Sequence, residues 1–221
     1  MMNAERGTAL LCALMIAALL GLLAGTLVVV VATETMISAH HRDALRALYA
    51  ADAGVERAIG DLRTLSSWRS VPGTASGAST PDFRDGAVAP RLADGTILDL
   101  RRLTAERQAD SNAGYPAAAD RPIWRLFAHA PIERLLPPGL IRSPAYVVVW
   151  IADDVDDGDG DPARDSNGAL VLRAEAFALR GMRRRIEATV ARDAAREGSD
   201  PAEGESAGRT GVRMICWREV Q

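Results

Sequence analysis

The N-terminal part of the chain carries one uninterrupted apolar stretch between two charged residues. Residues 7–33 contain no charged side chain, and Arg6 and Glu34 flank them. As an α-helix rising 1.5 Å per residue, this stretch would be about 40 Å long, which exceeds the ~30 Å hydrocarbon core of a bilayer. The pattern predicts a transmembrane helix over residues 8–33.

The pattern changes at residue 34 without a helix-breaking residue. Residues 34–65 contain no proline, and apolar side chains recur there at spacings of three and four. This stripe comprises Leu45, Leu48, Val55, Ile59 and Leu62. Gly54 costs about 1 kcal/mol relative to alanine in a helix and would allow a bend. We expect an amphipathic continuation of the membrane helix; the alternative is a membrane anchor followed by a separate helix.

Residues 66–122 have the composition of a surface loop. Gly, Ser, Pro, Ala and Asp are abundant there, and the apolar islands are short. Loops of this length are uncommon unless they are functional or flexible. We expect a variable loop region with one short strand near residues 96–100, pinned to the core by Trp68 and Phe83.

Strand patterns dominate the rest of the chain. Residues 145–152 form a continuous β-branched and aromatic run, which is typical of a well-buried strand. Two further runs flank Gly181 and indicate an antiparallel hairpin. Residues 123–136, which Pro131 interrupts, fit either a short strand and a turn or two helical turns.

These elements predict an α+β fold. One long N-terminal helix, with a membrane half and an amphipathic half, is expected to pack on a small antiparallel sheet of about four strands. The expected divisions are a leader (1–7), a transmembrane helix (8–33), its amphipathic continuation (34–65), a loop region (66–122), a sheet (123–193), a flexible linker (194–211) and a terminal strand (212–221).

Net charge and the motifs present argue against two broad classes of function, nucleic-acid binding and catalysis. The formal net charge is -3, whereas a general nucleic-acid binder shows a basic surplus. The basic cluster at residues 180–185 is interpreted as a hairpin tip, with contact to DNA or an anionic surface as the alternative. The sequence has no P-loop and no Cys/His pair, and we do not expect an enzyme.

The two cysteines are not expected to pair. Cys12 lies in the apolar stretch and Cys216 lies near the C-terminus, so a bridge would tie the membrane helix to the last strand. We interpret Cys216 as a half-buried strand residue.

Residues 153–165, "DDVDDGDGDPARD", are the strongest candidate for a ligand site. Asp157, Asp159 and Asp161 have the one-three-five spacing with which an EF-hand calcium loop begins. The match then fails, because proline and glycine stand at positions six and twelve, where glycine and a bidentate glutamate are needed. The segment is either a calcium site at these three aspartates or an acidic, solvated hairpin loop, and we expect no other cofactor.

The short polar leader "MMNAERG" meets the apolar stretch at Gly7. A secretory signal has an apolar region of about 7–15 residues behind a basic start, whereas here the run is nearly twice that and Glu5 and Arg6 cancel. Release by signal peptidase after Ala32 is the weaker alternative. The leader resembles the type III leader of type IV prepilins, which the prepilin peptidase cuts after glycine before methylating the new N-terminus. The resemblance implies cleavage between Gly7 and Thr8.

This sequence departs from the pilin pattern at the fifth residue of the mature chain. Major pilins carry Glu there, which neutralises the N-terminal amine of a neighbouring subunit, and this sequence carries Cys12. A buried ammonium group without its carboxylate partner is unfavourable. The departure favours a minor or tip subunit over one that repeats along a fibre.

A more specific resemblance lies in "ALYAADAGVERAI", residues 47–59. Together with "RGTALLCALMIAALLGLL" and the "TETMISAHHR" link, it is similar to the N-terminal region of PilX-type minor pilins. The later phrases "YVVVWIADD" and "CWREV" extend the resemblance along the chain in the same order. The resemblance implies a structural subunit of a type IV pilus or pseudopilus, involved in pilus assembly and without catalytic residues.

The implied partners are the prepilin peptidase, other major and minor pilin subunits, and the membrane, with no nucleic acid. The implied location is the bacterial inner membrane with the C-terminal domain periplasmic, then the cell surface after assembly. The alternative from another class is an uncleaved single-pass inner-membrane protein with a periplasmic binding domain.

Overall fold

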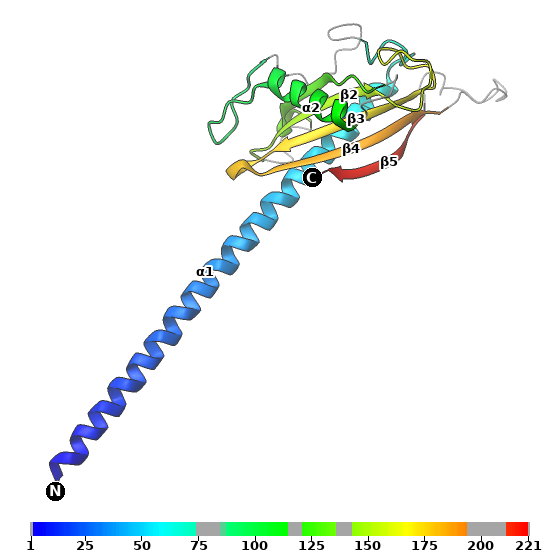
Figure 1. The fold of residues 1–221 in the computed structure, drawn as a ribbon. Coiled ribbons are helices and arrows are strands. Elements are labelled where there is room, and N and C mark those ends of the chain that lie inside the picture. Colours follow the sequence, from blue (N-terminus) through cyan, green and yellow to red (C-terminus); the bar gives the residue numbers. More distant parts are fainter. Residues whose placement is uncertain are drawn as a thin grey trace, which may run out of the picture. The chain divides into compact units, whose positions relative to one another are not determined.

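The computed structural model describes residues 2–73, 85, 87–114, 121–135, 143–193 and 211–220, with side chains from residue 8 onward. The chain divides into two compact units, Met1–Asp43 and Ala44–Gln221. The first contains most of helix α1 (Met2–Arg63). The second, the head, contains the last turns of α1 and all other elements, which Figure 1 colours along the sequence.

The N-terminal part of α1 is the apolar helix predicted from the sequence. Its large apolar side chains from Leu10 to Val31 are all more than half exposed. The hydroxyl of Thr26 donates to a carbonyl oxygen one turn back (2.8 Å), as does that of Thr33 (2.9 Å). Among the described residues α1 is the helix long and apolar enough to cross a membrane. A helix also keeps its backbone hydrogen bonds internal, as lipid requires.

The last turns of α1 pack in the head through mostly small side chains. The buried positions are Ala47, Ala50, Ala51, Val55, Ala58, Ile59 and Leu62. Leu45, which the sequence pattern assigned to the apolar stripe, is exposed instead, because the stripe runs through the alanines beside it. The helix ends at Arg63, before the predicted end at residue 65.

The sheet has five strands rather than about four, and all neighbours are antiparallel. The strands are β1 (Arg125–Pro131), β2 (Tyr146–Asp153), β3 (Ala169–Phe177), β4 (Arg183–Arg192) and β5 (Val212–Val220), in that spatial order. A single 3₁₀ turn (Ile132–Arg134) follows β1, so the strand-and-turn interpretation of this segment is the one observed. The long helix on a small antiparallel sheet is an α+β layout consistent with a pilin-like fold.

The predicted hairpin at Gly181 is confirmed. β3 pairs with β4 along its whole length, from Ala169 opposite Ala191 to Phe177 opposite Arg183. The turn places both Arg180 (φ 59°) and Gly181 (φ 69°) in the left-handed region, which glycine adopts without strain.

All eight residues of β2 are buried because both faces of the sheet are covered. On one face Val147, Val149 and Ile151 pack with the apolar stripe of α1. On the other, Val148 and Trp150 pack with helix α2 (Leu100–Gly114). A strand covered on both faces reads as an unbroken apolar run, which explains the "YVVVWIA" pattern.

Helix α2 lies within residues 66–122, where a loop region was expected. Asp99 caps its N-terminus, since its Oδ1 accepts hydrogen bonds from the backbone amides of Arg101 (3.0 Å) and Arg102 (3.1 Å). The buried positions are Leu100, Leu103, Arg107 and Ser111. Because the second half of this stripe is polar, an apolar-periodicity test does not detect the helix.

The rest of the expected loop region is only partly described. The short strand expected near residues 96–100 is reduced to one bridge between Arg91 and Ile97. Trp68 is buried, and its indole N–H donates to the carbonyl oxygen of Leu62 (3.1 Å), so it pins this segment to the core as predicted. Phe83 lies outside the described residues.

Candidate functional site

The predicted processing junction, Gly7–Thr8, lies within the first turns of α1. Thr8 and Cys12 are both exposed, and their separation of four residues places them on one face of the helix. No charged residue follows until Glu34. The junction therefore opens directly onto an apolar helix surface.

The acidic loop between β2 and β3 uses its aspartates in two different ways. Asp159 accepts a hydrogen bond from the amide of Asp161 (2.8 Å), and Asp161 accepts one from the amide of Ala163 (3.2 Å). Asp159 also pairs with Arg164 (3.5 Å). These two carboxylates of the predicted calcium set thus shape the turn.

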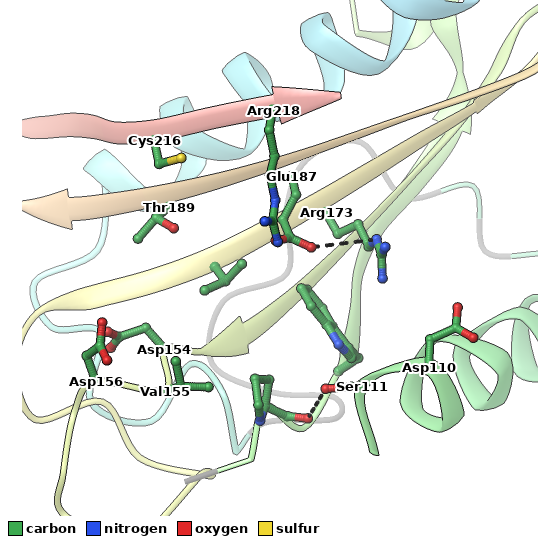
Figure 2. Close-up of a pocket in the computed structure, with 13 residues that line it drawn as sticks. Asp110, Ser111, Asp154, Val155, Asp156, Arg173, Glu187, Thr189, Cys216 and Arg218 are labelled. Atoms are coloured by element: carbon green, nitrogen blue, oxygen red, sulfur yellow. Dashed lines mark hydrogen bonds and ion pairs between the residues drawn. The ribbon is translucent and has the colours of Figure 1, made fainter. Parts of the chain in front are cut away.

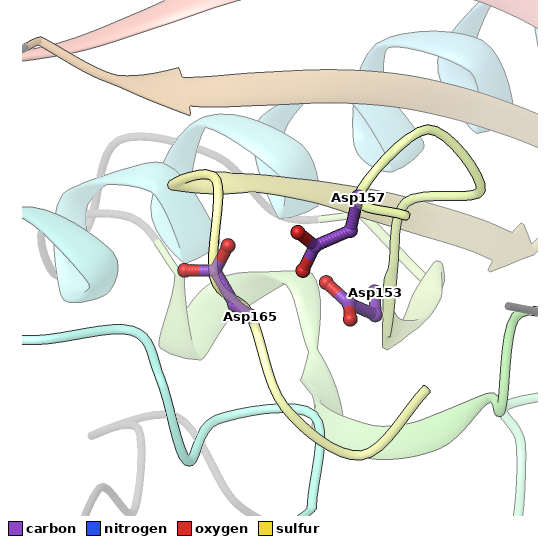
Figure 3. A group of neighbouring side chains, drawn as sticks. All are labelled: Asp153, Asp157 and Asp165. Atoms are coloured by element: carbon purple, nitrogen blue, oxygen red, sulfur yellow. The ribbon is translucent and has the colours of Figure 1, made fainter. Parts of the chain in front are cut away.

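The third predicted ligand, Asp157, joins a different group. Its carboxylate, that of Asp153 at the end of β2 and that of Asp165 further along the loop each offer an oxygen, and all three oxygens lie within 4.8 Å of one another. We call these three residues the acidic triad; Figure 3 shows the carboxylates of Asp153 and Asp157 facing each other, with that of Asp165 beside them. Asp153 is 2% exposed and Asp165 is 5% exposed.

The triad is electrostatically unfavourable in the protein alone. Burial, and then the neighbouring carboxylates of Asp157, Asp165 and Asp154, raise the pKa of Asp153 to about 7. Burial also raises the pKa of Asp165, although hydrogen bonds from the amides of Gly168 and Ala169 oppose that shift. Such shifts arise where like charges lie together away from water.

Sequence reasoning missed Asp153 and Asp165 as partners of Asp157. The one-three-five spacing drew attention to residues that are adjacent along the loop. The sequence did contain one usable signal: Asp153 directly follows a fully apolar run. A carboxylate at the end of such a strand is buried together with it.

A cavity of about 350 Å³ lies on the α2 side of the sheet (Figure 2). The guanidinium of Arg173 lies over the ring of Trp124, 5.7 Å from its centroid, and 3.9 Å from the Glu187 carboxylate. Cys216, expected to be half-buried, is exposed in the wall of the cavity. No histidine lines it, and its two arginines, Arg173 and Arg218, both pair with Glu187.

A buried ion cluster joins α2 to the sheet. Glu175, fully buried on β3, lies 3.0 Å from Arg107 of α2 in an ion pair without hydrogen-bond alignment. It also accepts a hydrogen bond from Nε of Arg183 (2.7 Å) and lies 3.7 Å from Arg185. Two arginines of the basic cluster at residues 180–185 are therefore partners of one carboxylate.

His129 of β1 belongs to a chain of polar groups with Tyr146 and Asp85, of which His129 and Tyr146 are buried. Tyr146 donates its hydroxyl proton to Asp85 (3.2 Å), and Nδ1 of His129 lies 3.0 Å from the same hydroxyl oxygen. The chain ties residue 85 to β1 and β2, and none of its members lines the cavity or the acidic triad.

Comparisons of this chain with protein families, with characterised proteins and with solved structures find no match.

Proposed function

We propose that the chain is a minor pilin-like subunit of a type IV pilus or pseudopilus. The prepilin peptidase cuts it between Gly7 and Thr8, and the mature chain is held in the inner membrane before it enters a filament. The observation that supports this function is the continuity of helix α1. One unbroken helix runs from an exposed apolar segment into a segment that packs on a small antiparallel sheet.

In this function the N-terminal part of α1 has two successive environments. In the membrane its apolar side chains contact lipid, and in a filament they contact the same segment of neighbouring subunits. Both environments are dry, so a helix without charges from Thr8 to Thr33 suits each of them. The head then displays its loops on the outside of the filament.

Cys12 gives a direct test of the minor-subunit assignment. Replacing Cys12 with Glu is expected to leave membrane insertion intact and to raise the amount of the subunit in filaments. A carboxylate there can pair with the N-terminal ammonium of a neighbour, and an ion pair worth about 1 kcal/mol changes such a partition about fivefold. The measurement is the ratio of this subunit to the major subunit in sheared filaments.

Ala13→Glu is the matched control, because it adds the same charge about 100° around the helix. It should not raise the ratio. An unchanged ratio for Cys12→Glu, with normal membrane levels, would count against the assignment.

The second candidate function is an uncleaved single-pass membrane protein whose periplasmic domain binds a ligand. The cavity of about 350 Å³ beside Arg173 and Trp124 favours it, since small-molecule sites are concave and of this size. The two functions differ in the N-terminus of the mature chain.

A further inference from the structure

The acidic triad has the spacing of ligands around one divalent cation. Oxygens bind Ca²⁺ at about 2.3–2.6 Å, so two of them on one ion lie at most about 4.6–5.2 Å apart. The oxygens offered by Asp153, Asp157 and Asp165 all lie within 4.8 Å of one another. One ion can therefore contact all three without a change of backbone.

A separate observation comes from the surroundings of Asp153. This side chain is 98% buried, as its exposure of 2% shows, yet its Oδ1 accepts one hydrogen bond, from the adjacent amide of Asp154 (3.2 Å). Within the described part of the chain, its Oδ2 accepts none. Figure 3 shows the carboxylate turned toward Asp157. A carboxylate on so deeply buried a side chain is costly unless something positive meets it.

The described residues do not provide that positive charge. The loop has one arginine, Arg164, and it pairs with Asp159. No ion pair among the described residues includes a member of the triad. A bound cation would meet the three carboxylates at once.

We propose that Asp153, Asp157 and Asp165 bind one Ca²⁺ ion, which fastens the β2–β3 loop to the end of β2. Three carboxylates and no histidine or cysteine form a hard-oxygen set, which disfavours zinc and the softer transition metals. Mg²⁺ is usually held by one or two carboxylates in a strict octahedron, whereas Ca²⁺ accepts three together with carbonyl and water oxygens.

Two of the ligands are already held in place by the loop. The amide of Ser166 donates to Oδ2 of Asp157 (2.7 Å), and its hydroxyl contacts Oδ1. Oδ1 of Asp165 accepts from the amides of Gly168 (2.7 Å) and Ala169 (3.2 Å). Hydrogen bonds of this kind orient carboxylates for a metal.

Calorimetric titration with CaCl₂ tests the site. The full chain is purified in nonionic detergent micelles, stripped with a chelator and exchanged into calcium-free buffer. We expect one Ca²⁺ per chain, and a rise in unfolding temperature of about 5–10 °C at a hundredfold excess over Kd. Asp153→Asn, Asp157→Asn and Asp165→Asn should each bind at least about tenfold more weakly or not at all.

Asp156→Asn is the matched control, because Asp156 is an exposed aspartate of the same loop and lies outside the triad. It should bind calcium as the unchanged protein does. Cooperative unfolding of each variant in calcium-free buffer shows that it folds, and asparagine keeps the shape of aspartate.

Three results would overturn the site: no binding by the unchanged protein, equal binding by Asp153→Asn and Asp156→Asn, or Mg²⁺ binding as tight as that of Ca²⁺. The calcium site does not depend on the pilin function, because titration of the head is indifferent to how the N-terminus is processed.

Discussion

Replacing Gly54 with valine is expected to destabilise the head by about 3 kcal/mol, and replacing it with alanine by about 1–2 kcal/mol. A Cβ atom at this position would lie 2.6 Å from Cγ1 of Val147 and 3.3 Å from Cγ2 of Val149, both on β2. Alanine gains about 1 kcal/mol of helix propensity over glycine, but the overlap with a fully buried strand outweighs that gain. Gly54 is thus explained by the close packing of α1 on the sheet rather than by a bend, because α1 continues through it.

Gly60→Ala is the matched control on the same helix. A Cβ there meets nothing within 4 Å, so this change should stabilise the head by about 0.5–1 kcal/mol. The measurement is urea unfolding of the full chain in micelles, followed by tryptophan fluorescence, since all four tryptophans lie in the head. Equal stabilisation by both alanines would contradict the close approach of α1 to β2.

Glu175→Gln is expected to cost about 3 kcal/mol, the lower end of the range for breaking a buried ion pair. Glutamine keeps the shape of the side chain and removes its charge, which leaves Arg107, 3% exposed, beside two further arginines. Burial already lowers the pKa of Arg107, and the charge of Glu175 opposes that shift. Asp110 remains as a partner of Arg107 at 2.8 Å, which is why the upper end of the range is not expected.

Arg102→Ala on the same helix provides the comparison. Arg102 pairs with Glu106 at 2.9 Å, but the two side chains are 78% and 42% exposed, and such surface pairs contribute about 0–1 kcal/mol. The same fluorescence-detected unfolding measures both variants. If Glu175→Gln costs no more than Arg102→Ala, α2 is not anchored by the buried cluster.

The elements that follow apolar periodicity were predictable from the sequence. The run at residues 145–152 and the two runs around Gly181 became β2, β3 and β4 because β-branched residues with turn residues between them leave few alternatives. The apolar stretch at residues 8–33 is helical, as its unbroken length without a charged residue predicted.

The elements whose buried positions are polar were not predictable in this way. Helix α2 buries Arg107 and Ser111 in the second half of its stripe, and Arg107 is stable there because Glu175 lies opposite on β3. That pairing depends on the fold and leaves no local trace. The Asp99 cap was the local signal available, and it marks only where the helix begins.

The acidic triad illustrates the same limit at the candidate site. Local spacing identified Asp157 but combined it with Asp159 and Asp161, whose carboxylates bind the loop's own backbone. The residues that meet Asp157 come from the end of β2 and from the far side of the loop. Their proximity follows from the pairing of β2 with β3, which closes the loop.

The measurement that tests the central claim most directly is the mass of the N-terminal peptide. The full chain is expressed with and without a prepilin peptidase, and the N-terminus is identified by mass spectrometry. The pilin function predicts a terminus at Thr8 that carries one methyl group and depends on the peptidase. A terminus at Met1 or Met2 in both cultures would contradict it and leave an anchored periplasmic domain, and a terminus at Thr33 would make the apolar stretch a signal peptide.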